Sequence, residues 1–89
     1  MSVTHAGKGV IKLTTQGDSL SGARYFTYMR WVGATTAGHV MKANDTAGDL
    51  IWESEADGAN FNAIHPLFDR RVGLVIGSMT SGFVLAYYK

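Results

Sequence analysis

The sequence predicts an all-β domain, a small antiparallel β-sandwich or barrel with meander hairpins. Three apolar-rich runs between residues 30 and 53 are separated by two short polar breaks that contain glycine, at residues 34–38 and 44–48. Alternating runs bounded by Gly, Asn, Asp and Ser are typical of strands and turns. The breaks are too short for a crossover helix, so neighbouring strands are expected to be antiparallel. Turn signals recur about every ten residues, which is the spacing of small sandwiches and barrels.

Length and composition predict one small domain that needs help to be stable. The chain has 89 residues and no cysteine, so disulfides and thiolate metal sites are excluded. A domain of this size buries only roughly 60–70% of its unfolded surface. Small domains are usually stabilised by disulfides, metals or partners, and we therefore expect a homo-oligomer. Residues 1–9 are small, polar and glycine-rich and are expected to form a flexible arm before a β domain of residues 10–89.

Charge and hydropathy exclude several classes of partner. Eight Lys and Arg residues are balanced by seven Asp and Glu residues, which gives a net charge of +1. No basic stripe is present, so direct binding of nucleic acid is not expected. No apolar run approaches the roughly 20 residues that span a bilayer, so no membrane association is expected. The first residues lack a secretion signal, and synthesis in a cytoplasm is expected.

The first half of the chain predicts two strands. Residues 10–15 alternate in polarity and form the first candidate, and residues 16–22 are expected to be a loop. Residues 25–32 form the longest candidate, with large apolar groups on both faces. A helix is the competing interpretation, but the aromatic residues and the closing Trp31-Val32 favour a strand. A strand with two apolar faces is either central in a sandwich or packs against another copy of the protein.

The second half predicts two hairpins. Residues 39–43 and 49–54 are expected to pair around a turn at residues 45–48, and residues 55–60 form a polar turn. Residues 61–68 are expected to be an irregular or edge segment, because Pro66 lacks a backbone donor. Residues 72–79 and 83–88 are expected to form a last hairpin across residues 80–82. Gly73 and Gly77 leave one face bare, where another backbone or a large side chain can lie close.

The candidate metal ligands are scattered. His5, His39 and His65 are far apart in the sequence, whereas metal sites usually contain ligands at short paired spacings. Residues 44–49 have some features of a calcium loop, but their glycine is in the wrong place and the flanks are strands. A hairpin turn explains this segment better. No metal and no cofactor is therefore expected.

Catalytic motifs are also lacking. Glu53 and Glu55 would share one face of a strand, but adjacent acids on a strand are usually solvated. No Gly-x-Ser-x-Gly elbow occurs. Gly7-x-Gly9 lacks the strand-then-helix setting of a phosphate-binding loop. We therefore predict that the protein is not an enzyme and has no catalytic residues.

Aromatic and arginine residues are the best candidates for an interface, because Tyr, Trp and Arg dominate the energetics of protein interfaces. Stacking on bases or sugars is the alternative use of the aromatic residues, although single-strand binders pair them with basic grooves. The doublet Arg70-Arg71 either caps a strand end in solvent or binds an acidic patch on a partner. The predicted interface residues are Tyr25, Tyr28, Arg30, Trp31, Arg70, Arg71 and Tyr88.

The second part of the chain carries a recognisable pattern. A tryptophan strand at residues 31–33 leads into a Thr-Ala-Gly turn at residues 36–38, and Leu50-Ile51-Trp52-Glu53 follows as an aliphatic strand that ends in an acid. Gly73-Leu74 and the turn Ser81-Gly82 before residues 84–87 complete it. This pattern, from Arg30 to the C-terminus, resembles small virion structural proteins of tailed bacteriophages, in particular capsid decoration or cement proteins.

The resemblance implies a non-enzymatic protein that binds the major capsid protein and stabilises the head. It implies a location on the capsid surface of the virion and a homo-oligomer, with a trimer as the expected state. The alternative is a ligand-binding β module of a phage tail or fibre that recognises carbohydrate or a host surface. Such a module would place an exposed Trp31 or Trp52 against a sugar ring.

Overall fold

Seven strands make up the fold in the computed structural model, which describes residues 3–7 and 9–89. Every strand pairing in these residues is antiparallel, in the order β1-β2-β7-β3-β6-β4-β5, and no helix is present. The prediction of an all-β antiparallel fold is confirmed. The strands are β1 (Val3–Gly7), β2 (Val10–Leu13), β3 (Ser19–Ala34), β4 (Val40–Asn44), β5 (Leu50–Glu55), β6 (Phe61–Met79) and β7 (Phe83–Tyr88).

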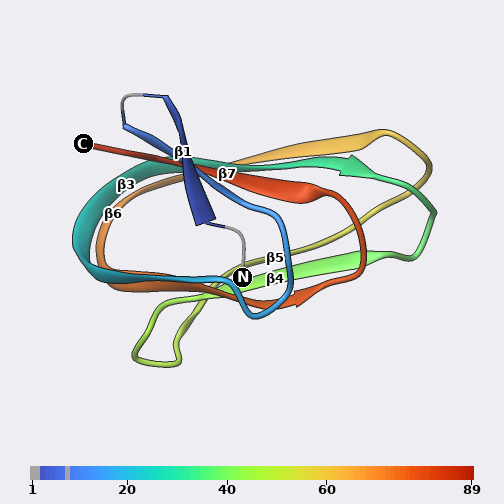
Figure 1. Ribbon diagram of the computed structural model, residues 1–89. Coiled ribbons are helices and arrows are strands. Elements are labelled where there is room, and N and C mark those ends of the chain that lie inside the picture. The colour runs from blue at the N-terminus through green and yellow to red at the C-terminus, as the bar shows by residue number, and fades with distance from the viewer. Residues whose placement is uncertain (1–2, 8) are drawn as a thin grey trace.

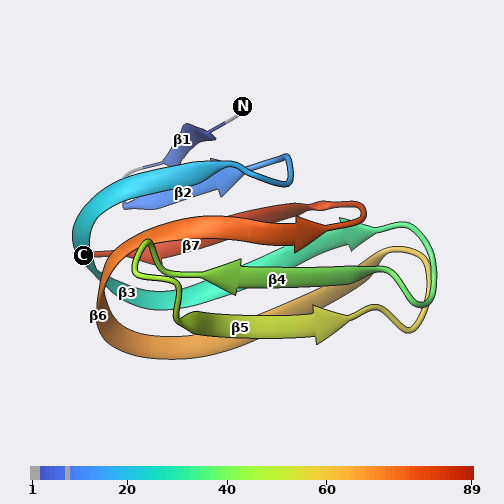
Figure 2. The same ribbon diagram turned by 90° about the horizontal axis from the view of Figure 1, so that it is seen from below.

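The strands form two layers because β3 and β6 are long and bend together from one layer into the other (Figure 1). The first layer, called the β7 layer, contains β1, β2, β7, residues 25–34 of β3 and residues 61–70 of β6. The second, called the β4 layer, contains residues 19–24 of β3, residues 71–79 of β6, β4 and β5. Figure 2 shows β1 and β5 at opposite borders of the fold.

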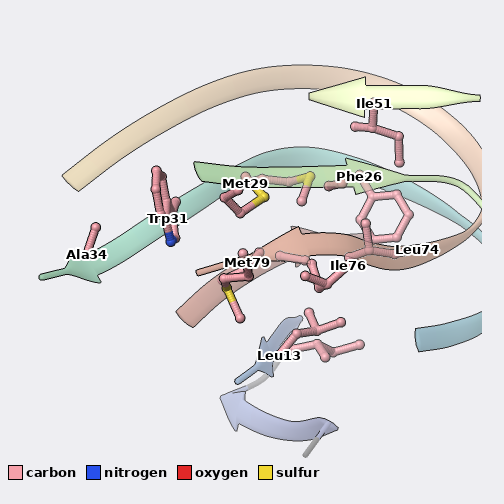
Figure 3. Packing of buried hydrophobic residues seen from close by; sticks show 14 of the residues in the cluster. Leu13, Phe26, Met29, Trp31, Ala34, Ile51, Leu74, Ile76 and Met79 are labelled. Carbon is pink, nitrogen blue, oxygen red and sulfur yellow. The ribbon is translucent and has the colours of Figure 1, made fainter. Parts of the chain in front are cut away.

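The core lies between the two layers (Figure 3). Phe26, Met29 and Trp31 point inward from β3 and are fully buried. Leu74 and Ile76 from the second half of β6 and Leu13 from β2 meet them. Successive side chains of a strand point to opposite faces, so the buried residues of β3 place Tyr28, Arg30 and Val32 on the outside.

The N-terminal segment differs from the expected flexible arm. Val3–Gly7 forms β1 and pairs with β2, although residues 1, 2 and 8 lie outside the described part of the chain. Gly9 has a φ of 74°, which suits glycine, and its carbonyl accepts a hydrogen bond from the Tyr88 backbone at 2.9 Å. The short segment is ordered by backbone pairing with its neighbour, and composition alone does not reveal such pairing.

The predicted hairpin of residues 72–79 and 83–88 is not formed. β6 ends in the β4 layer and β7 lies in the β7 layer, so residues 80–82 cross between layers (Figure 1). The meander is likewise incomplete, since β4 pairs with β6 and β5 rather than with β3. Strands joined by an arch across a sandwich show the same alternation as strands joined by a hairpin, which explains both differences. The predicted hairpin of β4 and β5 is confirmed.

Residues 61–68 form the first part of β6 and pair only with β3 among the described residues, so the edge interpretation is correct. The predicted loop at residues 16–22 is shorter than expected, because β3 starts at Ser19. Other groups lie close to Gly73 and Gly77 of β6, as was predicted from the lack of side chains at these positions. A Cβ on Gly73 would lie 2.6 Å from the Leu20 carbonyl oxygen, and one on Gly77 would lie 3.2 Å from the Asn44 amide.

Candidate binding surface

The outward side chains of the β7 layer form one apolar surface, which we call the outer aromatic face. Tyr28, Tyr87 and Phe68 come from three different strands and lie near one another because their strands are neighbours in the sheet. Leu85 and Ile64 flank Arg30 on either side. The face consists of Val10, Lys12, Tyr28, Arg30, Val32, Asn62, Ile64, Pro66, Phe68, Phe83, Leu85 and Tyr87.

Tyr28 is the centre of an aromatic cluster on this face. Its ring centroid lies 5.3 Å from that of Tyr87 and 6.0 Å from that of Phe68, the latter in an edge-on arrangement. Tyr28 is 40% exposed and Phe68 is 58% exposed, while nearby Ile64 is 62% exposed. Contiguous exposed apolar groups on a small domain mark a binding site more often than scattered ones do.

Phe68 is held outward by an unfavourable backbone conformation. Its φ is 47°, in the left-handed region that bulky residues rarely adopt. The register of β3 and β6 shifts between Phe26 and Tyr28, so a bulge in β6 creates this conformation. Such a conformation costs of order 1–3 kcal/mol. The backbone conformation of Phe68 lowers the stability of the fold while its ring stays exposed. This combination favours a role for the ring in binding.

Two cations and no acid lie on the outer aromatic face. The Lys12 ammonium sits 4.3 Å from the centroid of the Phe83 ring. The Nε atom of Arg30 is buried between its neighbours and has no hydrogen-bond partner among the described residues. A buried donor without a partner is costly, so the position of Arg30 on this face costs stability. The face therefore suits a partner that combines apolar contact with carboxylates.

The strand edges are less suited to binding than this face. Pro66 removes a donor from the open edge of β6, and the bulge at Phe68 distorts the same edge. The border strand β5 carries Glu53 and Glu55, both exposed. Charges, prolines and bulges at edges oppose strand-to-strand association.

The structure separates the predicted interface residues. Tyr28 and Arg30 lie on the outer aromatic face, whereas Trp31 is fully buried in the core and cannot contact a partner in this fold. Tyr25 and Tyr88 are half-buried where the pairing of β3 with β7 ends. There the Lys89 ammonium lies 5.7 Å from the centroid of the Tyr25 ring, and the Arg24 guanidinium lies 5.3 Å from that of Tyr88.

The arginine doublet has two different settings. Arg70 is exposed, and Arg71 forms salt bridges with Asp45 at 3.3 Å and with Asp69 at 3.2 Å. Arg71 is therefore engaged within the chain. The sequence prediction missed Ile64, Phe68, Leu85 and Tyr87. The alternating side chains of residues 83–88 indicated that Leu85 and Tyr87 share one face of the strand. The local sequence did not indicate whether that face points to the core or to the outside.

The turn at residues 45–48 is organised by a buried carboxylate. Asp45 Oδ1 accepts hydrogen bonds from the backbone N–H groups of Ala47 and Asp49, both at 3.0 Å. Burial raises the pKa of Asp45. The Asp49 N–H, the Arg71 guanidinium and the Ala47 N–H lower the pKa by more than burial raises it, so it lies below its usual value. The hairpin-turn interpretation of this segment is confirmed, since the acid bonds its own turn.

Ser81 and His39 form a contact that resembles a nucleophile and its base, with Oγ and Nδ1 separated by 2.8 Å. Ser81 Oγ also accepts a hydrogen bond from the Thr35 backbone N–H at 3.0 Å. It therefore links the connection between β3 and β4 to the connection between β6 and β7. No cavity adjoins it within the described chain. Thr35 Oγ1 lies 3.5 Å from the same imidazole nitrogen, so His39, Ser81 and Thr35 form one small polar cluster.

His65 stacks on Trp52, with ring centroids 5.4 Å apart. Within residues 3–7 and 9–89, no group of three or more His, Cys, Asp or Glu side chains could hold a metal ion. The same part of the chain contains no helix that is long and apolar enough to span a bilayer.

Comparisons with known proteins add little. No protein-family model matches the chain, and no curated protein matches it. A crystal structure of a cupin domain from Bordetella pertussis is similar over 99% of this chain and 90% of that chain, with 16% sequence identity and a TM-score of 0.40. This similarity is too distant to carry an argument about function. The function must therefore be inferred from the surface itself.

Proposed function

We propose that this protein is a non-enzymatic structural protein that binds other proteins through the outer aromatic face. The observation that carries the proposal is the strained, exposed Phe68 beside Tyr28, on a face whose two cations form no salt bridge with another described residue. Aromatic anchors and arginine dominate the energetics of protein interfaces. The described residues enclose no pocket for a small substrate, which is consistent with binding rather than catalysis.

The setting we propose is a virus particle, where the protein would decorate the capsid and bind the major capsid protein. The support is the resemblance of residues 30–89 to small virion proteins of tailed bacteriophages. Stabilising a shell requires a rigid module with a large contact face, and a small sandwich with an apolar outer face meets that need. Several copies, with a trimer as the expected state, would act together on a symmetric shell.

The carbohydrate-binding alternative receives less support from the geometry. It relied on Trp31 or Trp52 lying flat against a sugar ring. Trp31 is fully buried, and one face of the partly buried Trp52 ring is taken by His65. Tyr28 remains exposed, but its neighbours on the face are apolar side chains and cations rather than a ring of hydrogen-bonding groups.

The test is attachment to particles. Particles purified from a lysate should contain the protein in roughly stoichiometric amounts with the shell protein. Ile64→Ser, which removes an exposed apolar group from the face, should lower this occupancy several-fold. Val72→Ser is the matched control, because Val72 is also β-branched and 51% exposed but lies outside the face. Equal occupancy of the two variants and the wild type would overturn the proposal.

A further inference from the structure

We propose that the outer aromatic face of one copy binds Glu53 and Glu55 of a second copy, so that the protein assembles head to tail. The proposal rests on the proposed function, because it names a partner for the same face. It follows from how the chain distributes its charges between the two layers. The partner is another copy of this chain because the chain itself carries the acidic surface that the face lacks.

The outer surfaces of the two layers differ in net charge. The charged residues of the outer aromatic face are Lys12 and Arg30, and no acid accompanies them there. On the β4 layer Glu53 and Glu55 occupy neighbouring outward positions of β5, opposite Lys42 and Val40. Both glutamates are exposed, and neither forms a salt bridge with another described residue. Lys42 lies on the same outer side as Glu53, so the outward charges of the β4–β5 hairpin are two acids and one cation, against two cations on the outer aromatic face. The two surfaces therefore have net charges of opposite sign.

The spacing of the charges also matches. Lys12 and Arg30 both lie opposite Leu85, one from β2 and one from β3, so two strand spacings separate them. Two strand spacings are roughly 9–10 Å. Glu53 and Glu55 are two residues apart on one strand, which is roughly 6.5 Å. The long flexible side chains of lysine and glutamate span the difference, so each carboxylate can reach one cation.

A head-to-tail contact is favoured over a symmetric one between two aromatic faces. A symmetric pair would bring Lys12 and Arg30 against the same cations of the other copy, and like charges at an interface are strongly unfavourable. The head-to-tail contact would instead bring carboxylates next to Lys12 and to the half-buried Arg30 side chain. Apolar contact from Tyr28 and Ile64 would add to the ion pairs, since both are exposed.

Contacts between two different surfaces have a known consequence. They close into a ring where the rotation between copies permits and otherwise continue as an open chain. A closed ring of few copies agrees with the expected trimer. In a ring both surfaces of every copy are engaged, and in an open chain only the two end copies keep one surface free. Both assemblies would depend on salt because ion pairs contribute.

The experiment is a charge-reversal series measured by sedimentation velocity over a range of protein concentrations. The wild type should associate, and the association should weaken as salt is raised. Glu53→Lys with Glu55→Lys should raise the dissociation constant of self-association at least about tenfold, because the exposed substitutions place like charges in contact. Asp49→Lys with Asp57→Lys is the matched control, which adds the same charge at exposed positions outside the two outward glutamate sites and should have a much smaller effect.

Rescue makes the test specific. A chain that combines Glu53→Lys and Glu55→Lys with Lys12→Glu and Arg30→Glu has both surfaces reversed, and it should associate again. Circular dichroism and urea unfolding should show that each variant is folded. A monomeric wild type at high micromolar concentration, or no effect of the glutamate reversals, would overturn this inference. If Ile64→Ser still lowered particle occupancy in that case, the proposed function would stand, with the shell protein as the partner of the face.

Discussion

Trp31 donates a hydrogen bond from its indole Nε1 to the backbone carbonyl of Ser81 at 2.9 Å. This bond joins the buried centre of β3 to the arch that carries the chain from β6 to β7. The strand that supplies Tyr28 and Arg30 to the outer aromatic face is thus fixed from its inner side. The position of the face depends on a core contact, because inner and outer residues alternate on the same strand.

Trp31→Phe should therefore destabilise the fold by about 2–4 kcal/mol, since it removes the donor and leaves a cavity in the core. Urea unfolding of both proteins at one concentration measures the loss. Trp52→Phe is the control, because Trp52 is only partly buried, stacks on His65 and packs at the margin of the core. The decrease in the free energy of unfolding should be clearly smaller for Trp52→Phe. Equal decreases for the two variants would show that the Trp31 hydrogen bond has no special role.

Gly82→Ala should be more damaging than Gly38→Ala. Both glycines have a positive φ, 78° and 90°, so alanine is strained at either position. A Cβ at Gly82 would also lie 2.5 Å from the Val32 carbonyl oxygen, whereas one at Gly38 meets nothing within 4 Å. We expect about 1–2 kcal/mol of destabilisation at Gly38 from the backbone alone. At Gly82 we expect about 2 kcal/mol or more in addition, measured by thermal or urea unfolding.

The arch at Ser81 and Gly82 also shows what sequence alone can predict. The alternation of residues 83–88 located β7 correctly, because side-chain period is a local property. The same alternation cannot tell a hairpin from an arch, because the choice depends on which distant strand receives the chain. Trp31 was placed in an interface for a related reason. Residues 25–32 are apolar on both faces, and only the position of the β4 layer decides which face is the core.

Asp45 should make the fold sensitive to acid. Its folded pKa lies below its ordinary value of 3.8 because the turn N–H groups and Arg71 outweigh the effect of burial. A carboxyl with a lowered folded pKa contributes stability that is present above its unfolded pKa and is lost as pH falls through the folded pKa. Urea unfolding followed from neutral pH to below pH 4 should therefore show a stability loss that is smaller in Asp45→Asn.

The asparagine keeps a side-chain oxygen for the Ala47 and Asp49 N–H groups, so the turn itself should persist. Asp49→Asn serves as the control, because the Asp49 side chain is exposed and the hydrogen bonds between Asp49 and Asp45 use only backbone groups of Asp49. This control should retain the acid sensitivity of the wild type. A parallel pH profile for wild type and Asp45→Asn would contradict the assignment of the acid-sensitive group to Asp45.

Phe68→Asn should separate stability from binding. Asparagine tolerates the left-handed conformation far better than phenylalanine, so relief of strain should offset the lost ring contact with Tyr28. We expect the free energy of unfolding to stay within about 1 kcal/mol of the wild type or to rise. Particle occupancy and self-association should both fall, because an exposed aromatic anchor has left the face. Phe61→Asn provides the contrast, since the Phe61 ring packs on Trp31 at a centroid distance of 5.7 Å. Its replacement by asparagine should destabilise the fold. If Phe68→Asn unfolded as readily as Phe61→Asn, the Phe68 ring would be a structural group and the strain at its backbone would have no functional meaning.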